Sequence, residues 1–324
     1  MKRIATAALT LSCSLLAAAC GGGGDDDTTA DDTDNTGTPC GDLVIPGGDG
    51  NPGFAKPLDD AGECIFVKAW SDGDPVAAPD LSCLNTPSDD APTTLDVTLT
   101  TKVVDFQDNS EVLDGATVTA FNGIEISDGD EFDSQVSAGN GDLTFTVPTG
   151  TTRFGFKMKR SGWFDTLLLN QYVDPGTAAQ SIGVIQAVSV ATGTALPGLV
   201  GISRTPGKGI LAGTIRDCAG NELSGVIATV SSTPGTVTHV GGTRTYYFSN
   251  STGLPVRNTV LNATSENGLF AGLEIDPTAT AYVQMWGILS QADLDAGTLT
   301  LIGELEVPVV GDVVITGSYE PLRN

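Results

Sequence analysis

The chain has few of the residues that most often carry catalysis. Its 324 residues include one histidine, three methionines and three tryptophans, and only 6% are aromatic. A Ser-His-Asp or Cys-His site would have to use the single histidine, His239, and no Gly-x-Ser-x-Gly motif accompanies it. One histidine also excludes a histidine-based zinc site, and no two cysteines have the Cys-x-x-Cys spacing. The sequence therefore predicts a protein that is not an enzyme and that uses no cofactor.

Basic residues are scarce as well. The chain has 15 Lys and Arg against 40 Asp and Glu, a formal net charge of -25. A nucleic-acid binder needs a basic surface that displaces phosphate counterions, so nucleic acid is excluded as a partner. Charge alone also disfavours binding to an anionic lipid surface. A hydrolase with paired carboxylates stays open in so acidic a chain, although such sites normally lie in aromatic clefts.

The first twenty residues have the pattern of an export signal. Met1-Lys2-Arg3 is basic, and the uncharged run that follows to residue 19 is too short to span a bilayer. We predict a secretory signal peptide over residues 1–19. Its end, Leu-Leu-Ala-Ala-Ala-Cys at residues 15–20, resembles a bacterial lipobox. That resemblance implies lipidation of Cys20, and Gly21 after the cysteine favours an outer-membrane lipoprotein. Cleavage after an Ala-x-Ala motif, which would release a soluble protein, is the alternative.

Residues 20–38 are rich in glycine and aspartate. Glycine gives flexibility and the aspartates repel one another, so this segment cannot bury enough apolar area to fold by itself. We expect a disordered acidic tether that holds the folded part away from the membrane. The lipid anchor would then be the only contact with the membrane.

The segment from residue 39 to 92 is loop-rich and carries three of the mature cysteines, Cys40, Cys64 and Cys83. Besides Cys20, the only other mature cysteine is Cys218, which lies far along the chain. Cysteines in an exported protein pair readily, and four of them allow three connectivities. We favour Cys64 with Cys83, because the loop is compact and would gain about 3 kcal/mol from closure. Cys40 and Cys218 would then pair with each other.

Residues 93–187 carry the densest strand pattern. Apolar and polar residues alternate over 95–103, 115–121 and 143–148, and a further strand is predicted over 153–159. Asn140-Gly141 predicts a two-residue type I′ hairpin, since both central positions of that turn need positive φ. Short strands at regular spacing with turn residues between them predict an antiparallel sandwich.

One sequence pattern of this region occurs a second time later in the chain. Val103 to Ala120 has the order strand, polar turn, Gly-Ala, strand, and a shorter version returns 112 residues later, from Ile215 to Val230. A later Thr-x-x-x-Gly-x-Phe pattern, from Thr264 to Phe270, opens another strand of the second copy. An internal repeat of this kind indicates two units of one fold.

The order Val-Asp, turn, Gly-Ala-Thr-Val, then Asn-Gly-Asp-Leu-Thr-Phe-Thr-Val-Pro resembles the carboxypeptidase regulatory-like domain. The resemblance covers roughly residues 93–300. It implies a transthyretin-like, seven-stranded sandwich without catalytic residues. In the second copy Gly225-Val226 replaces the Gly-Ala that the family prefers.

We therefore predict an all-β fold with two tandem antiparallel β-sandwich domains, transthyretin-like or Ig-like. The first covers residues 93–187 and the second residues 208–324. The connector, 188–207, belongs to a charge-free stretch between Pro175 and Ser203 that glycines and prolines interrupt. A spanning helix is implausible there, and a short helix from Ser189 to Leu196 is expected.

Two groups of residues are candidates for binding. The second copy is longer between Gly225 and Gly268, and its extra residues include Tyr246, Tyr247 and Phe248. Extra length in one loop region of a repeat often carries function, so these aromatics could stack on a sugar or a peptide. Burial in the core of an added hairpin is the competing interpretation, and the usual one for aromatics in strands.

The second group is the acidic loop with Asp128, Asp130 and Asp133, whose oxygens at alternate positions suit Ca²⁺. Gly139 stands where an EF-hand has its bidentate glutamate, so a solvated hairpin tip is expected and calcium is the weaker hypothesis. Apart from this loop no metal site is predicted.

The sequence thus predicts a non-catalytic, envelope-anchored lipoprotein that acts as a structural or interaction module. Its partner would be an envelope protein or polysaccharide, and a carbohydrate- or peptide-binding role is the alternative. The oligomeric state does not follow from the sequence.

Overall fold

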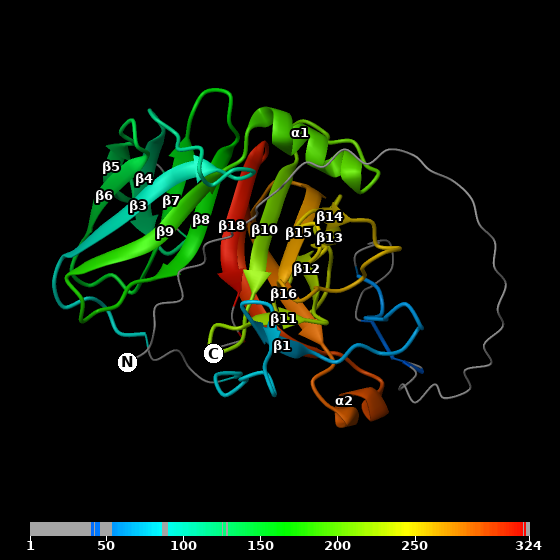
Figure 1. Cartoon of the computed structure of the whole chain (residues 1–324). Helices are drawn as coiled ribbons and strands as arrows, with labels where there is room; N and C mark the ends of the chain where they lie inside the picture. Colours follow the sequence, from blue (N-terminus) through cyan, green and yellow to red (C-terminus); the bar gives the residue numbers. More distant parts are fainter. Residues whose placement is uncertain are drawn as a thin grey trace.

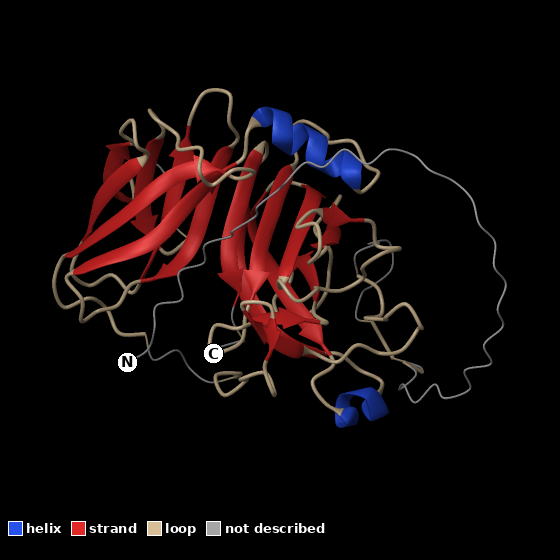
Figure 2. Cartoon of the chain, in the orientation of Figure 1, coloured by secondary structure: helices blue, strands red, loops and turns tan. Residues whose placement is uncertain are grey.

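The computed structural model describes residues 40–41, 43–45, 54–85, 90–124, 126–127, 129–319 and 321. Its regular structure is almost entirely strand (Figure 2). Two helices occur in the described part, α1 (Val190–Leu199) and α2 (Gln291–Ala296). The predicted all-β sandwich fold is confirmed.

The first unit is a sandwich of two sheets. Three strands form one sheet in the order β6 (Asp142–Val147), β3 (Val97–Asp105), β9 (Ala179–Ala187). Four strands form the opposite layer in the order β5 (Glu131–Val136), β4 (Thr117–Asn122), β7 (Arg153–Lys159), β8 (Asp165–Tyr172). Alternate residues of β3 and β6 are buried, as the sequence pattern predicts, and meet Phe154, Phe156 and Met158 of β7 in one core.

The second unit repeats this arrangement with additions. One layer has the order β12 (Ile227–Ser231), β16 (Thr278–Gly287), β17 (Thr300–Val309). The other has the order β14 (Pro255–Val256), β13 (Arg244–Phe248), β15 (Leu269–Ile275), β10 (Gly209–Ile215), β18 (Val313–Tyr319). β12 and β15 contribute no exposed residue, because both of their faces are covered.

The two units share a sheet. β18 pairs in parallel with β10 on one side and with β8 of the first unit on the other, so nine strands form one continuous sheet. Figure 1 shows β18 in red between β8 and β10. β3 and β9 are parallel as well. The expectation of purely antiparallel sheets is therefore wrong: the last strand of each unit returns beside the first in the same direction.

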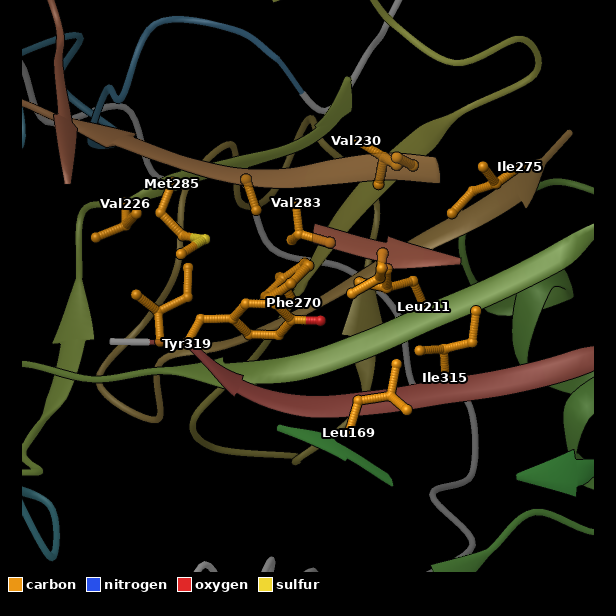
Figure 3. Close-up of a cluster of buried hydrophobic side chains, with 14 of the residues drawn as sticks. Leu169, Leu211, Val226, Val230, Phe270, Ile275, Val283, Met285, Ile315 and Tyr319 are labelled. Atoms are coloured by element: carbon orange, nitrogen blue, oxygen red, sulfur yellow. The ribbon is translucent and has the colours of Figure 1, made fainter. Parts of the chain in front are cut away.

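The two cores lie on opposite faces of this shared sheet. Leu168 of β8 packs against the first core, whereas its neighbours Leu167 and Leu169 belong to the second core with Ile315 of β18. Figure 3 shows Leu169, Leu211 and Ile315 in this second core, together with Val230, Val283 and Met285. Successive side chains of a strand point to opposite faces, so β8 contributes to both sandwiches.

The repeat is visible in individual hydrogen bonds. In the first unit the Ser137 hydroxyl accepts from the Ala116 N–H (2.9 Å) and donates to the Leu113 carbonyl (2.6 Å). In the second unit the Thr264 hydroxyl accepts from the Val226 N–H (3.0 Å) and donates to the Leu223 carbonyl (2.8 Å). Gly115 and Gly225 donate their N–H groups to the carbonyls of these same two residues, Ser137 and Thr264. The two units are thus built on the same turn.

Asn140-Gly141 does not form the predicted type I′ hairpin. Only Gly141 has positive φ (77°), and the strands that flank the turn, β5 and β6, belong to different sheets. A Cβ on Gly141 would lie 2.8 Å from the Val103 carbonyl oxygen, which explains the glycine. Gly268 is its equivalent: its φ is 63°, and a Cβ there would lie 2.6 Å from the Ile215 carbonyl oxygen.

The cysteine-bearing segment lies on the second unit. β1 (Lys68–Ser71) pairs with β11 (Glu222–Ser224) and with β2 (Asp74–Pro75) in a small third sheet. Earlier residues of the segment, Cys40, Leu43 and Phe54, cover Ile227 and Trp286 on the outer face of the β12-β16-β17 layer. This segment therefore adds a layer that the first unit lacks.

Helix α1 lies in the segment predicted as the connector. The Ser189 hydroxyl accepts from the Thr192 N–H (3.1 Å) and caps the helix, which runs three residues past the predicted end and contains Pro197. The Thr192 hydroxyl donates to Gln107 in the first unit (2.9 Å), and Gly193 lies against the Phe164 ring. In the described residues, neither helix has the length and apolar character that crossing a membrane requires.

Candidate functional site

A large groove lies where the two units meet. Its volume is about 1350 Å³, and its lining runs from β9 and α1 across β8, β18 and β10 and includes Phe270, Met285 and Tyr319 of the second core. β9 forms one wall, β8, β18 and β10 form the floor, and α1 closes one end. The first sandwich covers one face of the shared sheet as far as β8. Beyond β8, the connector residues Val200 and Ile202 cluster with Ile210 and Ala212 of β10 and with side chains of β15 and β13.

The middle of the groove is apolar and its far end is polar. The apolar side chains come from five elements: Leu168, Ile182, Val184, Leu196, Ile210, Ala212 and Val314. The polar side chains gather at the end away from α1: Asp90, Arg153, Asn170, Tyr172, Arg216 and Ser318. An apolar floor with polar groups at one end is the usual composition of a protein binding site.

The charged groups of the groove are engaged with one another. The Arg153 guanidinium binds Asp90 (2.5 Å) and lies 5.4 Å from the centroid of the Tyr172 ring. Arg216 binds Glu222 at 3.1 Å. Both carboxylate oxygens of Asp174 accept hydrogen bonds, from the Gly176 N–H and the Thr177 hydroxyl. These pairings hold the carboxylates of Asp90 and Asp174 in place.

A smaller groove of about 540 Å³ lies on the opposite face, lined by Lys157, Trp163 and Asp312 among others. The Gly207 N–H and the Arg204 guanidinium (2.6 Å) bind the Asp312 carboxylate. These hydrogen bonds lower the pKa of Asp312 below its ordinary value, the backbone bond most strongly. The pair joins the connector to the turn before β18.

Tyr246, Tyr247 and Phe248 form β13 and are all buried. Tyr247 lies in the second core, where its hydroxyl accepts from the Ala228 N–H (3.1 Å). Tyr246 and Phe248 face the other way and are covered by Val200 of the connector. Their burial leaves no exposed aromatic surface for stacking, although Phe248 also lines the large groove. The interpretation as the core of an added hairpin is the right one.

The four cysteines form two disulfides, but not the pairs that loop length favoured. Cys40 pairs with Cys64, and Cys83 pairs with Cys218. Docking of the segment decides the pairing. The Asp217 carboxylate accepts from the Asp80 N–H (2.9 Å), and the Cys218 N–H donates to the Asp80 carbonyl (2.8 Å), which brings Cys83 to Cys218. Disulfides persist in oxidising compartments, so the chain belongs outside the cytoplasm.

The remaining predicted site residues gather no ligand set. Cys20 and Asp128 lie outside the described residues. Asp130 is exposed, and Asp133 accepts from the Thr146 N–H (2.9 Å) of the neighbouring strand β6. Within the described ranges, no three His, Cys, Asp or Glu side chains are grouped so that they could hold a metal ion. With Asp128 outside those ranges, calcium binding by the loop stays a prediction.

His239 is part of the packing. Its Nδ1 lies 2.8 Å from the Thr229 hydroxyl, and its ring meets Phe54 edge to face at 5.5 Å. Phe54 belongs to the segment that covers the β12-β16-β17 layer. The single histidine thus helps to seat that segment.

Sequence reasoning missed the groove because its walls come from distant parts of the chain. β9 and α1 both lie in the charge-free stretch, whose lack of charge was the one available indication of burial or binding. It also missed Ser137, which takes the place of Thr264 in the first unit. The spacing Ser137-x-x-x-Gly141 could have identified it.

Comparisons with known proteins assign no family. No protein-family description matches the chain, and no curated protein matches it. Among solved structures, the Bacillus anthracis TIE protein shares 14% identity over 70% of this chain and 34% of its own, with a TM-score of 0.23. This chain thus spans about a third of that protein.

Two further structures show the same level of likeness. The shaft pilin SpaA from Lactobacillus rhamnosus GG shares 12% identity over 71% of this chain and 98% of its own, with a TM-score of 0.22. The 3-chlorocatechol 1,2-dioxygenase from Rhodococcus opacus 1CP shares 12% identity over 35% of this chain and 68% of its own, with a TM-score of 0.22. Values this low carry nothing about function to this chain.

Proposed function

We propose that this protein is a non-catalytic module of the bacterial cell envelope, anchored by a lipid on Cys20, that acts by holding a partner. The observation that carries the proposal is the shared nine-stranded sheet, which joins two sandwiches into one body and lines a large groove where they meet. A site built on strands of a continuous sheet is held more precisely than one built on loops.

The groove chemistry supports binding over hydrolysis. A glycosidase needs two carboxylates facing a sugar, one of them protonated near neutral pH. The carboxylates of Asp90 and Asp174 are occupied by Arg153 and by the turn before β9. A hydrolase with paired carboxylates is therefore the less supported function.

The internal repeat agrees with the resemblance to carboxypeptidase regulatory-like domains, and we propose that both units, 93–187 and 208–324, are of this kind. The lipobox-like residues before Cys20 support a lipid anchor, with the outer membrane as the favoured location. The acidic segment 20–38 supports an extended tether between that anchor and the folded part.

Metabolic labelling tests the anchor. Cells that express the full chain are grown with an alkyne analogue of palmitate, and the protein is then isolated. We expect label on the wild type and none on Cys20→Ser, which should leave the membrane fraction. Label that survives in the variant, or an unlabelled wild type, would overturn the anchor. A glycan array tests a polysaccharide partner separately.

A further inference from the structure

We propose that the open edge of β9 accepts an extended segment of a partner polypeptide, which runs parallel to β9 along the groove and pairs with it as an added strand. This inference rests on the proposed function and deepens it, because it names the class of partner. The class is a peptide with an uncharged, leucine-like centre.

The repeat itself shows what this edge of the unit accepts. β9 is the last strand of the first unit and pairs in parallel with β3, and β18 is the last strand of the second and pairs in parallel with β10. Val103 and Ile215 are equivalent positions of the repeat. Val103 lies opposite Ile185 of β9, and Ile215 lies opposite Tyr319 of β18, so β9 and β18 are equivalent strands. The outer edge of β18 is occupied by β8, which is parallel to it.

Among the described residues, no strand pairs with the same edge of β9. β9 ends the order β6-β3-β9 in its sheet, and in the described part of the chain the ladder on its outer side begins only at Ser189, which bridges to Trp163. The Phe106 N–H donates to the Ala187 carbonyl on the inner side. Because backbone groups alternate along a strand, the N–H and C=O of Val184 point to the open side.

β9 carries little that would discourage such pairing. Soluble proteins usually blunt an edge strand with charged residues or proline. The sequence Ala-Gln-Ser-Ile-Gly-Val-Ile-Gln-Ala of β9 has neither, and its one irregularity is the bulge near Gly183. β17, an edge strand of the second unit, contains Glu306 and Pro308. The contrast indicates that β17 is protected and that β9 is left available.

The groove fits a strand in this place. A strand added to β9 would extend the three-stranded sheet toward β18 and β10, where Ala212, Thr316 and Ile210 line the groove. Its alternate side chains would then pack on the groove floor as in any sandwich. The chain's charge of -25 favours a partner segment without acidic flanks.

The sequence of β8 supplies the probe. A fluorescent peptide, Lys-Asp-Thr-Leu-Leu-Leu-Asn-Gln-Tyr-Lys, copies β8 between two lysines and is titrated into the full chain by anisotropy. Val184→Pro removes the outward N–H of β9, a place where an edge strand tolerates proline. The matched control is Val136→Pro. Val136 ends the edge strand β5, and its N–H also points outward, since the next residue, Ser137, donates inward to the Ala116 carbonyl.

We expect the wild type and Val136→Pro to bind the peptide alike and Val184→Pro to bind at least tenfold more weakly, with slower amide exchange at residues 181–186 of the wild type on binding. If Val184→Pro does not fold, Ala212→Trp, which fills the groove floor, replaces it with the same expectation. No binding by the wild type, or equal binding by the variant, would overturn the inference.

One more outcome would assign the edge to a different occupant. If the wild type self-associates and Val184→Pro is monomeric, a second copy of this chain takes the edge and the partner segment is wrong. Palmitate labelling of Cys20 is independent of these results, so the anchored module can stand when the strand addition fails.

Discussion

The first unit contains no cysteine, whereas the second is covered on its outer side by the N-terminal segment, which the disulfide between Cys83 and Cys218 links to it. The two units nevertheless share their turn hydrogen bonds, through Ser137 in one and Thr264 in the other. Their last strands also differ, since in the described part of the chain β18 is paired on both edges and β9 on one. The comparison shows that the same strand framework can be completed in two ways, depending on which segments pack against it and pair with its last strand.

Removing the disulfide between Cys83 and Cys218 should produce the largest loss, and it should fall on the second unit. The bond closes a sequence separation of 135 residues. Closure of a loop of that size stabilises by about 5 kcal/mol in the chain-entropy model. Urea unfolding of Cys83→Ser/Cys218→Ser should show this loss, against about 3.5 kcal/mol for Cys40→Ser/Cys64→Ser, whose separation is 24. A larger loss from the shorter loop would contradict this ranking.

Leu167→Ala should damage the second core although Leu167 belongs to a strand of the first unit. The side chain is fully buried in the second core, and a cavity left by leucine costs about 3 kcal/mol. Amide exchange should accelerate in β16. Leu168→Ala is the matched control, since Leu168 faces the first core and should accelerate exchange in β4. The same response from both variants would mean that the two cores are not on opposite faces.

Ser137→Ala and Thr264→Val should cost about the same, about 2 kcal/mol each, because each leaves one buried backbone N–H without its acceptor. The N–H groups are those of Ala116 and Val226. Thermal unfolding of the two variants checks the equivalence of the units. A loss of stability confined to one variant would show that the two turns do not contribute equally to stability.

The two smallest expected changes in stability come from tyrosines of the second core, and they have opposite signs. Tyr247→Phe removes the hydroxyl that accepts from the Ala228 N–H and should destabilise by about 1 kcal/mol. The Tyr319 hydroxyl is buried and has no hydrogen-bond partner among the described residues. Tyr319→Phe should therefore be neutral or stabilise by up to about 1 kcal/mol. Burial raises the pKa of both phenols, so both groups stay neutral at physiological pH. Destabilisation by Tyr319→Phe would contradict this.

Local patterns predicted much of the strand content. β7 begins and ends at the predicted residues, Arg153 and Lys159, and β3 lies within two residues of its predicted position. Alternation and turn residues suffice there because each strand has one face in a core. The prediction for the Asn140-Gly141 turn was wrong, since the local pattern that begins a hairpin is the same whether the next strand pairs or crosses to the other sheet.

The pairing of distant elements could not be predicted in the same way. Loop length favoured Cys64 with Cys83, but the contacts of Asp80 with Asp217 and Cys218 decided otherwise. The aromatic residues of β13 were possible ligand contacts until the connector and the second core covered them. In each case the deciding contact joins residues more than a hundred positions apart or lies between whole layers.

By itself the sequence determined the all-β class, the repeat 112 residues apart, the acidic charge and the presence of a single histidine. These follow from residue type and local period, which act over a few neighbours. Only the tertiary structure decided that β18 joins the units, that the cores lie on opposite faces and that β9 is left open beside a groove. Strand pairing depends on backbone groups that every residue carries, so partner choice is fixed by the packing of whole sheets.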